Sequence, residues 1–116
     1  MHETREVVQR YLEALKSGDV DAVTANFAAD IVLLCPEERV VGIDAFCAAC
    51  KEMFSGLLAP GTYARTVEHF VVEGDLALVT WSAACLGARM QYGTTSFVVR
   101  DGLITRMAAA YQIVSD

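Results

Sequence analysis

The sequence has few basic residues, and none of them form a cluster. Nine Lys and Arg stand singly along 116 residues, against fifteen Asp and Glu, which gives a net charge of −6. A protein that binds a nucleic-acid backbone presents a basic stripe or patch, because each phosphate contact needs a cation. Nucleic acid is therefore not an expected partner.

Long hydrophobic runs are also absent. No apolar run reaches the roughly 18–20 residues that cross a bilayer, and residues 1–6 (MHETRE) lack the hydrophobic stretch of a signal peptide. We therefore expect a cytoplasmic protein without membrane contact. The four cysteines are then expected to be free thiols, because the cytosol is reducing.

Length and composition indicate one globular domain. A chain of 116 residues has the size of a single domain, roughly 100–200 residues, and it contains no linker, repeat or low-complexity segment. Hydrophobic residues make up 54% of the chain, against an average of about 45–50%. We expect residues 1–116 to form one domain around one core.

Three helices are predicted in the first half of the chain. Apolar residues recur with helical spacing over 4–17 and again over 43–57. Between them, Asp19 is placed to cap a second, short helix that carries Phe27 on its apolar face and ends near 28–30.

The remaining elements are predicted to be strands. The apolar residues 31–35 stop at Pro36 and predict a short buried strand, and the charged residues 37–39 predict a loop. From residue 62 onward the pattern alternates with a period of two, and Gly and Asp mark the turns. The strands expected there cover 63–73, 76–86, 90–100 and 103–114. This order predicts an α+β fold, with three N-terminal helices packed on a curved antiparallel sheet.

The segment 76–88 predicts an interface between two copies of the chain. It contains no charged residue, although an antiparallel sheet with one solvated face alternates apolar and polar residues. Helices cover only one face of such a sheet. We therefore expect the other face to meet a second copy and to form a homodimer.

The N-terminal half carries a pattern that recurs in a known superfamily. It consists of residues 7–15 (VVQRYLEAL), then Gly18 and Asp19, then residues 27–30 (FAAD), and it closes at Pro36. With this pattern the chain resembles the ketosteroid isomerase branch, or SnoaL-like members, of the nuclear-transport-factor-like superfamily. The resemblance covers nearly the whole chain and implies a cone-shaped fold with a deep apolar pocket between sheet and helices. It identifies the fold better than the activity, because one fold carries many functions.

The resemblance also implies three catalytic positions. Tyr11 falls where ketosteroid isomerases keep the phenol that donates a hydrogen bond to a developing enolate oxygen. Cys35 stands at the position of their aspartate base, directly before a proline, and Thr95 at that of their second oxyanion donor. A thiol has a pKa near 8.5, which rises in apolar surroundings, so Cys35 is a poor base at neutral pH. Tyr11 is the catalytic residue that is retained, and Thr95 would be a weaker donor.

His69 is a further candidate for acid–base chemistry. Regular alternation places it on one face of its strand with Arg65 and Val67, and leaves open whether that face lines the pocket or lies at the surface. A metal site is not predicted, because no histidine cluster is present. Cys47 and Cys50 lie in the middle of a predicted helix, where core packing is favoured over redox or metal chemistry.

Other residues are expected to shape the pocket. The candidates for its lining are Phe54, Trp81, Phe97, Val99, Met107, Ala109 and Tyr111. For Trp81, a packing or interface position is the alternative. Glu37 and Glu38 either overhang the pocket mouth or are solvated loop charges. A cavity of this kind, apolar with few polar groups, suits a steroid-, polyketide- or terpenoid-like ligand.

Two functions are compatible with these residues. The first is a cofactor-independent enzyme of the proton-transfer type, an isomerase, cyclase or dehydratase acting on an apolar carbonyl compound, with Tyr11 as oxyanion donor. The second is a non-catalytic protein that binds an apolar small molecule in the same pocket. The retained Tyr11 favours the enzyme, and the missing aspartates favour the binding protein. A scaffold that only dimerises is a third hypothesis, and it requires no pocket.

Overall fold

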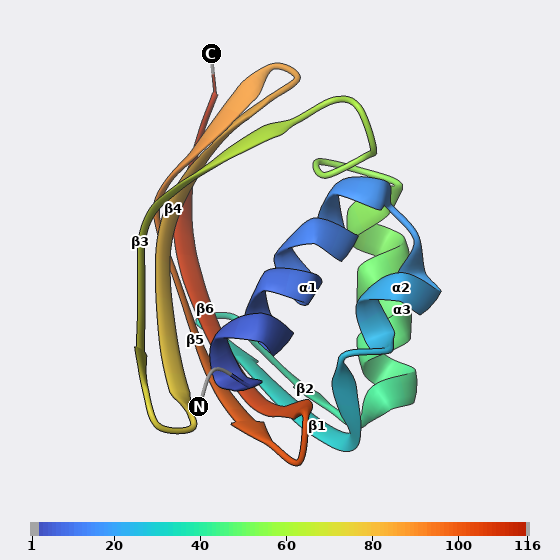
Figure 1. Cartoon of the computed structure of the whole chain (residues 1–116). Helices are drawn as coiled ribbons and strands as arrows, with labels where there is room; N and C mark the ends of the chain where they lie inside the picture. Colours follow the sequence, from blue (N-terminus) through green and yellow to red (C-terminus); the bar gives the residue numbers. More distant parts are fainter. Residues whose placement is uncertain (1–2, 116) are drawn as a thin grey trace.

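A curved six-stranded sheet forms one layer of the structure, and three helices lie against its concave face (Figure 1). The computed structural model describes residues 3–115, so Met1 and His2 of the segment 1–6 considered for a signal peptide lie outside the described residues. The elements are α1 (Glu3–Ser17), α2 (Val20–Thr24), β1 (Phe27–Cys35), β2 (Glu38–Val41), α3 (Ile43–Phe54), β3 (Ala64–Glu73), β4 (Leu76–Cys85), β5 (Ala88–Arg100) and β6 (Leu103–Ser115). The predicted α+β fold is thereby confirmed. No helix within residues 3–115 is long and apolar enough to cross a membrane.

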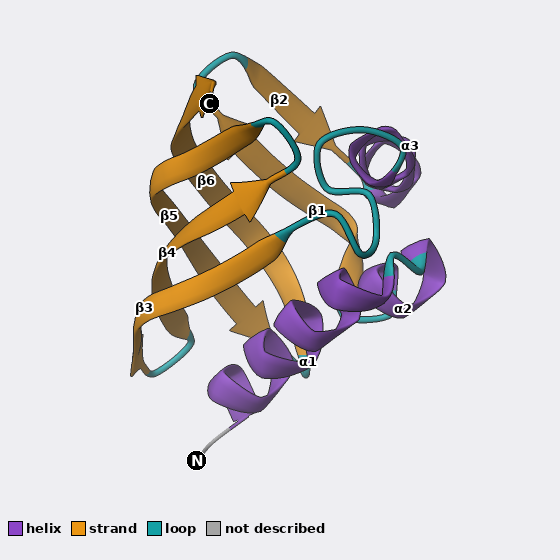
Figure 2. Ribbon diagram, turned by 90° about the horizontal axis from the view of Figure 1, so that it is seen from above, coloured by secondary structure: helices purple, strands orange, loops and turns teal. Residues whose placement is uncertain are grey.

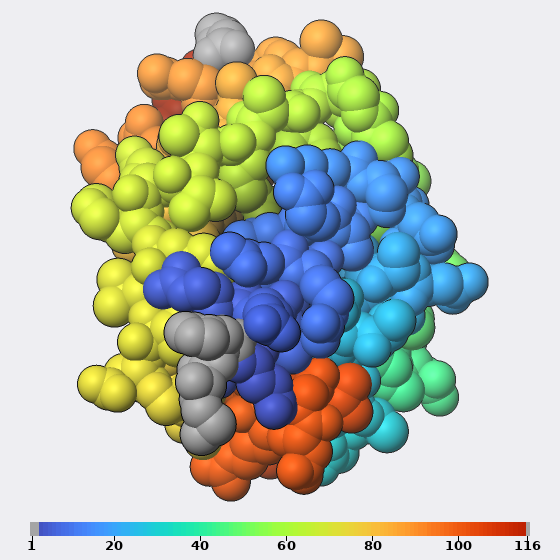
Figure 3. Space-filling model, in the orientation of Figure 1, coloured from blue at the N-terminus to red at the C-terminus, as the bar shows by residue number. Residues whose placement is uncertain are grey.

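Helix α1 covers much of the concave face. Its buried side chains are spaced three and four residues apart, at Thr4, Val7, Val8, Tyr11 and Leu15. Such positions share one side of a helix, so a single apolar stripe faces the sheet. In the space-filling view, the blue surface of α1 fills the side of the molecule between the yellow-green β3 and the light blue α2 (Figure 3).

The sheet has the strand order β2-β1-β6-β5-β4-β3. Strands β3 to β6 form the antiparallel meander that the alternating pattern predicts. Asp101 and Gly102, between β5 and β6, have φ values of 53° and 77°, which is the pair of positive angles that a type I′ hairpin turn requires. Strand β1, however, pairs with β6 in parallel, so the sheet is mixed. Figure 2 looks along α3, which packs against β1 and β2 at this end of the sheet.

The predicted end of the second helix is wrong. Phe27 begins β1 and pairs with Ile104 of β6, although the sequence pattern placed it on the helix. The side-chain amide of Asn26 donates to the carbonyl oxygens of Ala22 and Val23, which satisfies the last carbonyls of α2 and ends the helix before Phe27.

The predicted loop at 37–39 is also wrong in part. Residues 36–37 form a two-residue turn, and Glu38–Val41 returns along β1 as the edge strand β2. Charged residues are tolerated on an edge strand, because their side chains reach solvent while the backbone pairs. The consequence for function is that Glu38 lies opposite Cys35.

The two faces of the sheet differ in what covers them. On the inner face, Ala77, Val79 and Phe97 are buried beneath the helices. Nothing within residues 3–115 covers the outer face, where apolar side chains are 39–58% exposed at Leu34, Val41, Val71, Leu76 and Leu78. Side chains of the charge-free segment 76–88 therefore point alternately to the inner face, which the helices cover, and to the exposed outer face. The predicted second copy would pack on the outer face.

Candidate functional site

A cavity of about 360 Å³ lies between α1, α3 and the inner face of the sheet. This volume is within the usual range for small-molecule sites, about 300–1,000 Å³. Apolar side chains form most of its wall, including those of Leu33, Phe46, Met53, Leu57, Leu58, Met90 and Met107. The polar side chains among them are those of Tyr11, Cys35, Glu38, Glu52, Arg65, Thr95 and Tyr111.

Tyr11 presents an unpaired hydroxyl in this cavity. Its side chain is 6% exposed, and its ring is held edge-on by Phe27 and Phe97, with centroid distances of 5.3 and 5.5 Å. The hydroxyl forms no hydrogen bond within residues 3–115. Burial raises the pKa of Tyr11 above its usual value, and the positive charge of Arg65 opposes that rise. Tyr11 is thus a neutral donor that is available to an oxygen atom of a ligand.

Thr95 and Trp81 form a buried pair beside it. The indole Nε1 of Trp81 donates to Thr95 Oγ1 at 3.0 Å. Because the threonine oxygen already accepts this bond, its own O–H proton can be donated to a ligand. Gly93 lies opposite Trp81 on β5, and a Cβ atom at Gly93 would collide with the indole ring. The close approach of this glycine lets Trp81 lie flat on the sheet and reach Thr95.

Cys35 and Glu38 lie opposite each other on β1 and β2, and both line the cavity. Burial raises the pKa of the Cys35 thiol, and the charge of Glu38 raises it further. Burial is also the main reason for the raised pKa of Tyr111, to which the charges of Cys35 and Glu38 add. The Cys35 thiol therefore stays protonated at neutral pH, while Glu38 brings a carboxylate to the cavity wall.

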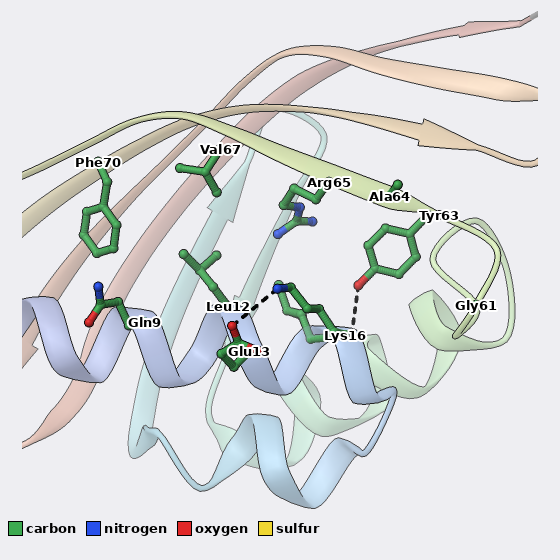
Figure 4. A pocket seen from close by; sticks show the side chains of 11 residues that line it. Gln9, Leu12, Glu13, Lys16, Gly61, Tyr63, Ala64, Arg65, Val67 and Phe70 are labelled. Carbon is green, nitrogen blue, oxygen red and sulfur yellow. Dashed lines mark hydrogen bonds and ion pairs between the residues drawn. The ribbon is translucent and has the colours of Figure 1, made fainter.

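Arg65 also lines the cavity, although the sequence pattern does not predict it as a site residue. Its guanidinium carbon lies 4.5 Å from the centroid of the Trp81 ring, and its Nε is buried without a hydrogen-bond partner. Arg65 also borders an open groove of about 700 Å³ between α1 and β3, where its side chain extends from the strand toward the helix (Figure 4). Regular alternation groups Arg65 with Val67 on one face of the strand, but the sequence does not show that this face points into the cavity.

The structure brings most of the predicted site residues together. Those that line the cavity are Tyr11, Cys35, Trp81, Thr95, Met107, Ala109 and Tyr111. Phe54, Phe97 and Val99 belong instead to the packed core and do not line it. The ring of Phe97 packs against Tyr11, so Phe97 supports the cavity wall from behind. The catalytic roles of Tyr11, Cys35 and Thr95 stay predictions.

His69 lies on the outer face of the sheet, so its predicted role as a pocket acid or base is wrong. The register shifts between Val67, which pairs with Trp81, and His69, which pairs with Thr80. This bulge inserts Glu68 as an extra residue, and the side chains after it change faces. The imidazole Nδ1 of His69 lies 2.9 Å from Thr80 Oγ1, at an exposed position.

Residues 3–115 contain neither a cluster of metal-ligand side chains nor a disulfide. No group of three or more His, Cys, Asp or Glu side chains within residues 3–115 is arranged to hold a metal ion. No disulfide joins the cysteines of this part of the chain. Burial, with a contribution from Cys47, raises the pKa of Cys50 to about 11, so this thiol is unreactive at neutral pH.

The curved sheet, the three helices and the cavity between them define an NTF2-like α+β cone fold. The chain belongs to the SnoaL-like domain family, which matches residues 8–107. No curated protein matches the sequence.

Solved structures that are described as three different kinds of enzyme share this fold. One, provisionally described as a ketosteroid isomerase from Kribbella flavida DSM 17836, has a TM-score of 0.81 and 22% identity over 99% of this chain and 82% of that one. Another, provisionally described as a polyketide cyclase from Sinorhizobium meliloti, has a TM-score of 0.77 and 26% identity over 90% and 93%. An LEH-like epoxide hydrolase from M. tuberculosis has a TM-score of 0.75 and 22% identity over 95% and 83%. The fold alone therefore does not select one reaction.

Proposed function

We propose that the protein is a cofactor-independent enzyme that moves a proton on an apolar, carbonyl-bearing small molecule. The reaction would be an isomerisation, a cyclisation or a dehydration. The observation that carries this proposal is the unpaired hydroxyl of Tyr11 in a cavity whose wall is mostly apolar. The descriptions of the solved structures, a ketosteroid isomerase and a polyketide cyclase among them, support the substrate class.

Two hydroxyl donors would stabilise the charge that develops in this reaction. Removal of a proton beside a carbonyl places negative charge on the carbonyl oxygen, and fixed donors lower the barrier by binding that oxygen. Tyr11 supplies one donor, and the O–H of Thr95, whose oxygen is held by Trp81, supplies the second. Since little water competes in an apolar cavity, both bonds are stronger there than in solution.

Glu38 is the base in this proposal. A carboxylate is suited to abstract a proton beside a carbonyl, whereas the Cys35 thiol is held protonated by burial and by Glu38 itself. Glu38 lies directly across from Cys35 in the β1–β2 pair, and it lines the cavity. A carboxylate is thus present one strand away from Cys35, where the resemblance places the aspartate base of ketosteroid isomerases.

A non-catalytic binding protein is the second candidate function. The observation in its favour is the exposure of Glu38, because an active site normally encloses its base and keeps water away from the reacting atoms. Such a protein would use the donors Tyr11 and Thr95 only to hold a ligand oxygen.

Exchange of carbon-bound protons separates the two functions. A panel of apolar cyclic ketones would be incubated with the protein in D2O, and NMR would follow deuterium entry beside the carbonyl. The enzyme is expected to accelerate exchange, Tyr11→Phe to slow it by about 10²-fold or more, and Glu38→Gln to abolish it. Tyr63→Phe is the matched control, because it removes a tyrosine hydroxyl outside this cavity and leaves exchange unchanged. Binding of a ketone without any accelerated exchange would favour the binding protein.

We also propose that the exposed outer face of the sheet is covered by a second copy of the chain. The support is the group of exposed apolar residues on that face, which includes Leu34 and Leu78. A cytoplasmic location stays a prediction from the sequence.

A further inference from the structure

We infer that the cavity receives a molecule with a carboxylate group and that Arg65 binds this carboxylate. The inference deepens the proposed function and rests on it, because it names the class of substrate, an apolar carboxylic acid, for the same cavity. The observations that carry it are the position of Arg65, its missing partner and the way in which its side chain is held.

Arg65 has no anionic partner in the protein. Its Nε is buried without a hydrogen bond, and its side chain forms no ion pair or hydrogen bond within residues 3–115. A buried donor on a charged group lowers stability unless something accepts its hydrogen bond. A carboxylate supplies that acceptor and also neutralises the charge, since the planar guanidinium fork binds both carboxylate oxygens in parallel.

The guanidinium is positioned before any ligand arrives. Its central carbon lies over the ring of Trp81, 4.5 Å from the ring centroid. The ring is fixed by the bond from its Nε1 to Thr95 and by the close packing of Gly93. A guanidinium that lies over an aromatic ring keeps its N–H groups directed outward at its edge, where an acceptor can reach them. Little side-chain freedom is then lost on binding, which favours affinity.

None of the acidic side chains near Arg65 within residues 3–115 forms an ion pair with it. Glu38 and Glu52 line the cavity, but both are exposed, and neither forms an ion pair with Arg65 within residues 3–115. In the adjoining groove, Glu13 pairs with Lys16 on α1 at 3.3 Å, as the dashed line in the close-up marks (Figure 4). Arg65 is thus the one basic residue in the cavity lining of the described chain.

The same position connects the carboxylate site to the proposed reaction. Among the charged and polar groups near Tyr11, Arg65 has the largest influence on the pKa of its hydroxyl, which it lowers against the effect of burial. A ligand whose carboxylate binds Arg65 therefore presents nearby atoms to Tyr11, while its apolar body contacts side chains such as Met53 and Met107. Methionine is flexible and adapts to irregular apolar shapes.

Matched pairs of acids and amides test the inference. The probes are cyclohexanecarboxylate and adamantane-1-carboxylate, each compared with its carboxamide, which has nearly the same shape without the charge. Calorimetry gives the affinities, and the fluorescence of Trp81, the one tryptophan of the chain, reports binding next to the guanidinium. For at least one pair, the wild type is expected to prefer the carboxylate by roughly tenfold or more.

Variants assign that preference to one residue. Arg65→Met is expected to abolish the preference and to leave the affinity for the amide within about twofold, and Arg65→Lys to keep part of it, because lysine has the charge without the fork. Arg5→Met is the matched control. The Arg5 guanidinium also lies 4.5 Å above an aromatic ring, that of Phe70, but outside this cavity, so its loss leaves the preference intact.

The inference and the proposed function fail in different ways. Absence of a carboxylate preference for every pair, whether or not the amides bind, overturns the inference, and so does a preference that survives Arg65→Met. Proton exchange on neutral ketones is unaffected by either result. Conversely, a carboxylate preference that depends on Arg65, in a protein that exchanges no protons, refutes the proposed catalysis and leaves the carboxylate site standing.

Discussion

The hydroxyl of Tyr11 is expected to contribute nothing to folding, although the side chain is buried. Tyr11→Phe keeps the ring and therefore its edge-on contacts with Phe27 and Phe97, at 5.3 and 5.5 Å. It removes no hydrogen bond within residues 3–115, and it relieves only a small part of the about 1–3 kcal/mol that a fully buried polar group without a partner costs, because the hydroxyl oxygen is not fully buried. The cavity beside the hydroxyl reduces this relief. We expect the free energy of unfolding to stay within about 0.5 kcal/mol of the wild type or to rise slightly.

Tyr63→Phe provides the contrast within the same protein. The hydroxyl of Tyr63 donates to the carbonyl oxygen of Leu15 at 2.9 Å, in a partly buried contact between the α3–β3 loop and the end of α1. Its removal leaves that carbonyl without this bond. The expected loss of unfolding free energy is about 0.5–1.5 kcal/mol. The two substitutions delete the same atom, so their difference isolates the hydrogen bond.

Urea unfolding measures both values. The fluorescence of Trp81 is the probe, and linear extrapolation gives the free energy of unfolding of each variant. The result that refutes the reasoning is a Tyr11→Phe protein destabilised by more than about 1 kcal/mol, as much as Tyr63→Phe or more. Tyr11 would then be a structural residue whose hydroxyl is satisfied in solution, and its role as a donor to a ligand would be lost.

Four further predictions concern other parts of the molecule. Gly93→Ala places a Cβ against the indole of Trp81 and is expected to destabilise the protein by about 1–3 kcal/mol and to lower ligand affinity, as thermal unfolding and calorimetry would show. Because folding raises the pKa of Cys50 from 9.0 to about 11, its contribution to stability is complete below pH 9 and is lost as the pH rises toward 11; Cys50→Ala should make the stability measured by urea unfolding depend less on alkaline pH. Cys35→Asp restores a carboxylate across the cavity from Tyr11 and should introduce measurable isomerisation of a 5-ene-3-ketosteroid; a folded variant that binds the steroid without turnover would show that the two positions do not act as one site. Sedimentation should find the wild type as a dimer at micromolar concentration and Leu78→Lys as a monomer, whereas a monomeric wild type contradicts the interface.

Local patterns in the sequence were sufficient for most of the fold. The stripe that includes Val7 and Tyr11 predicted α1 and its buried face, because helical geometry follows from spacing alone. The pair Asp101 and Gly102 predicted a hairpin, because few residues adopt two successive positive φ angles. For the site, the position of Tyr11 on the buried face of α1 and the place of Cys35 at the end of a strand were likewise available from the sequence.

Contacts between distant segments decided the rest. The faces of β3 depended on a bulge at Glu68, which turned His69 outward and left Arg65 inward; alternation cannot reveal an extra residue that only the partner strand defines. Glu38 lines the cavity because β2 pairs with β1. The charged side chains of residues 37–39 predicted a loop, so this strand pairing could not be inferred from them. The sequence by itself thus determined most of the helices and strands and indicated the family. The tertiary structure determined which charges face the cavity, because strand register, which is set by pairing across the whole sheet, fixes the direction of every side chain on it.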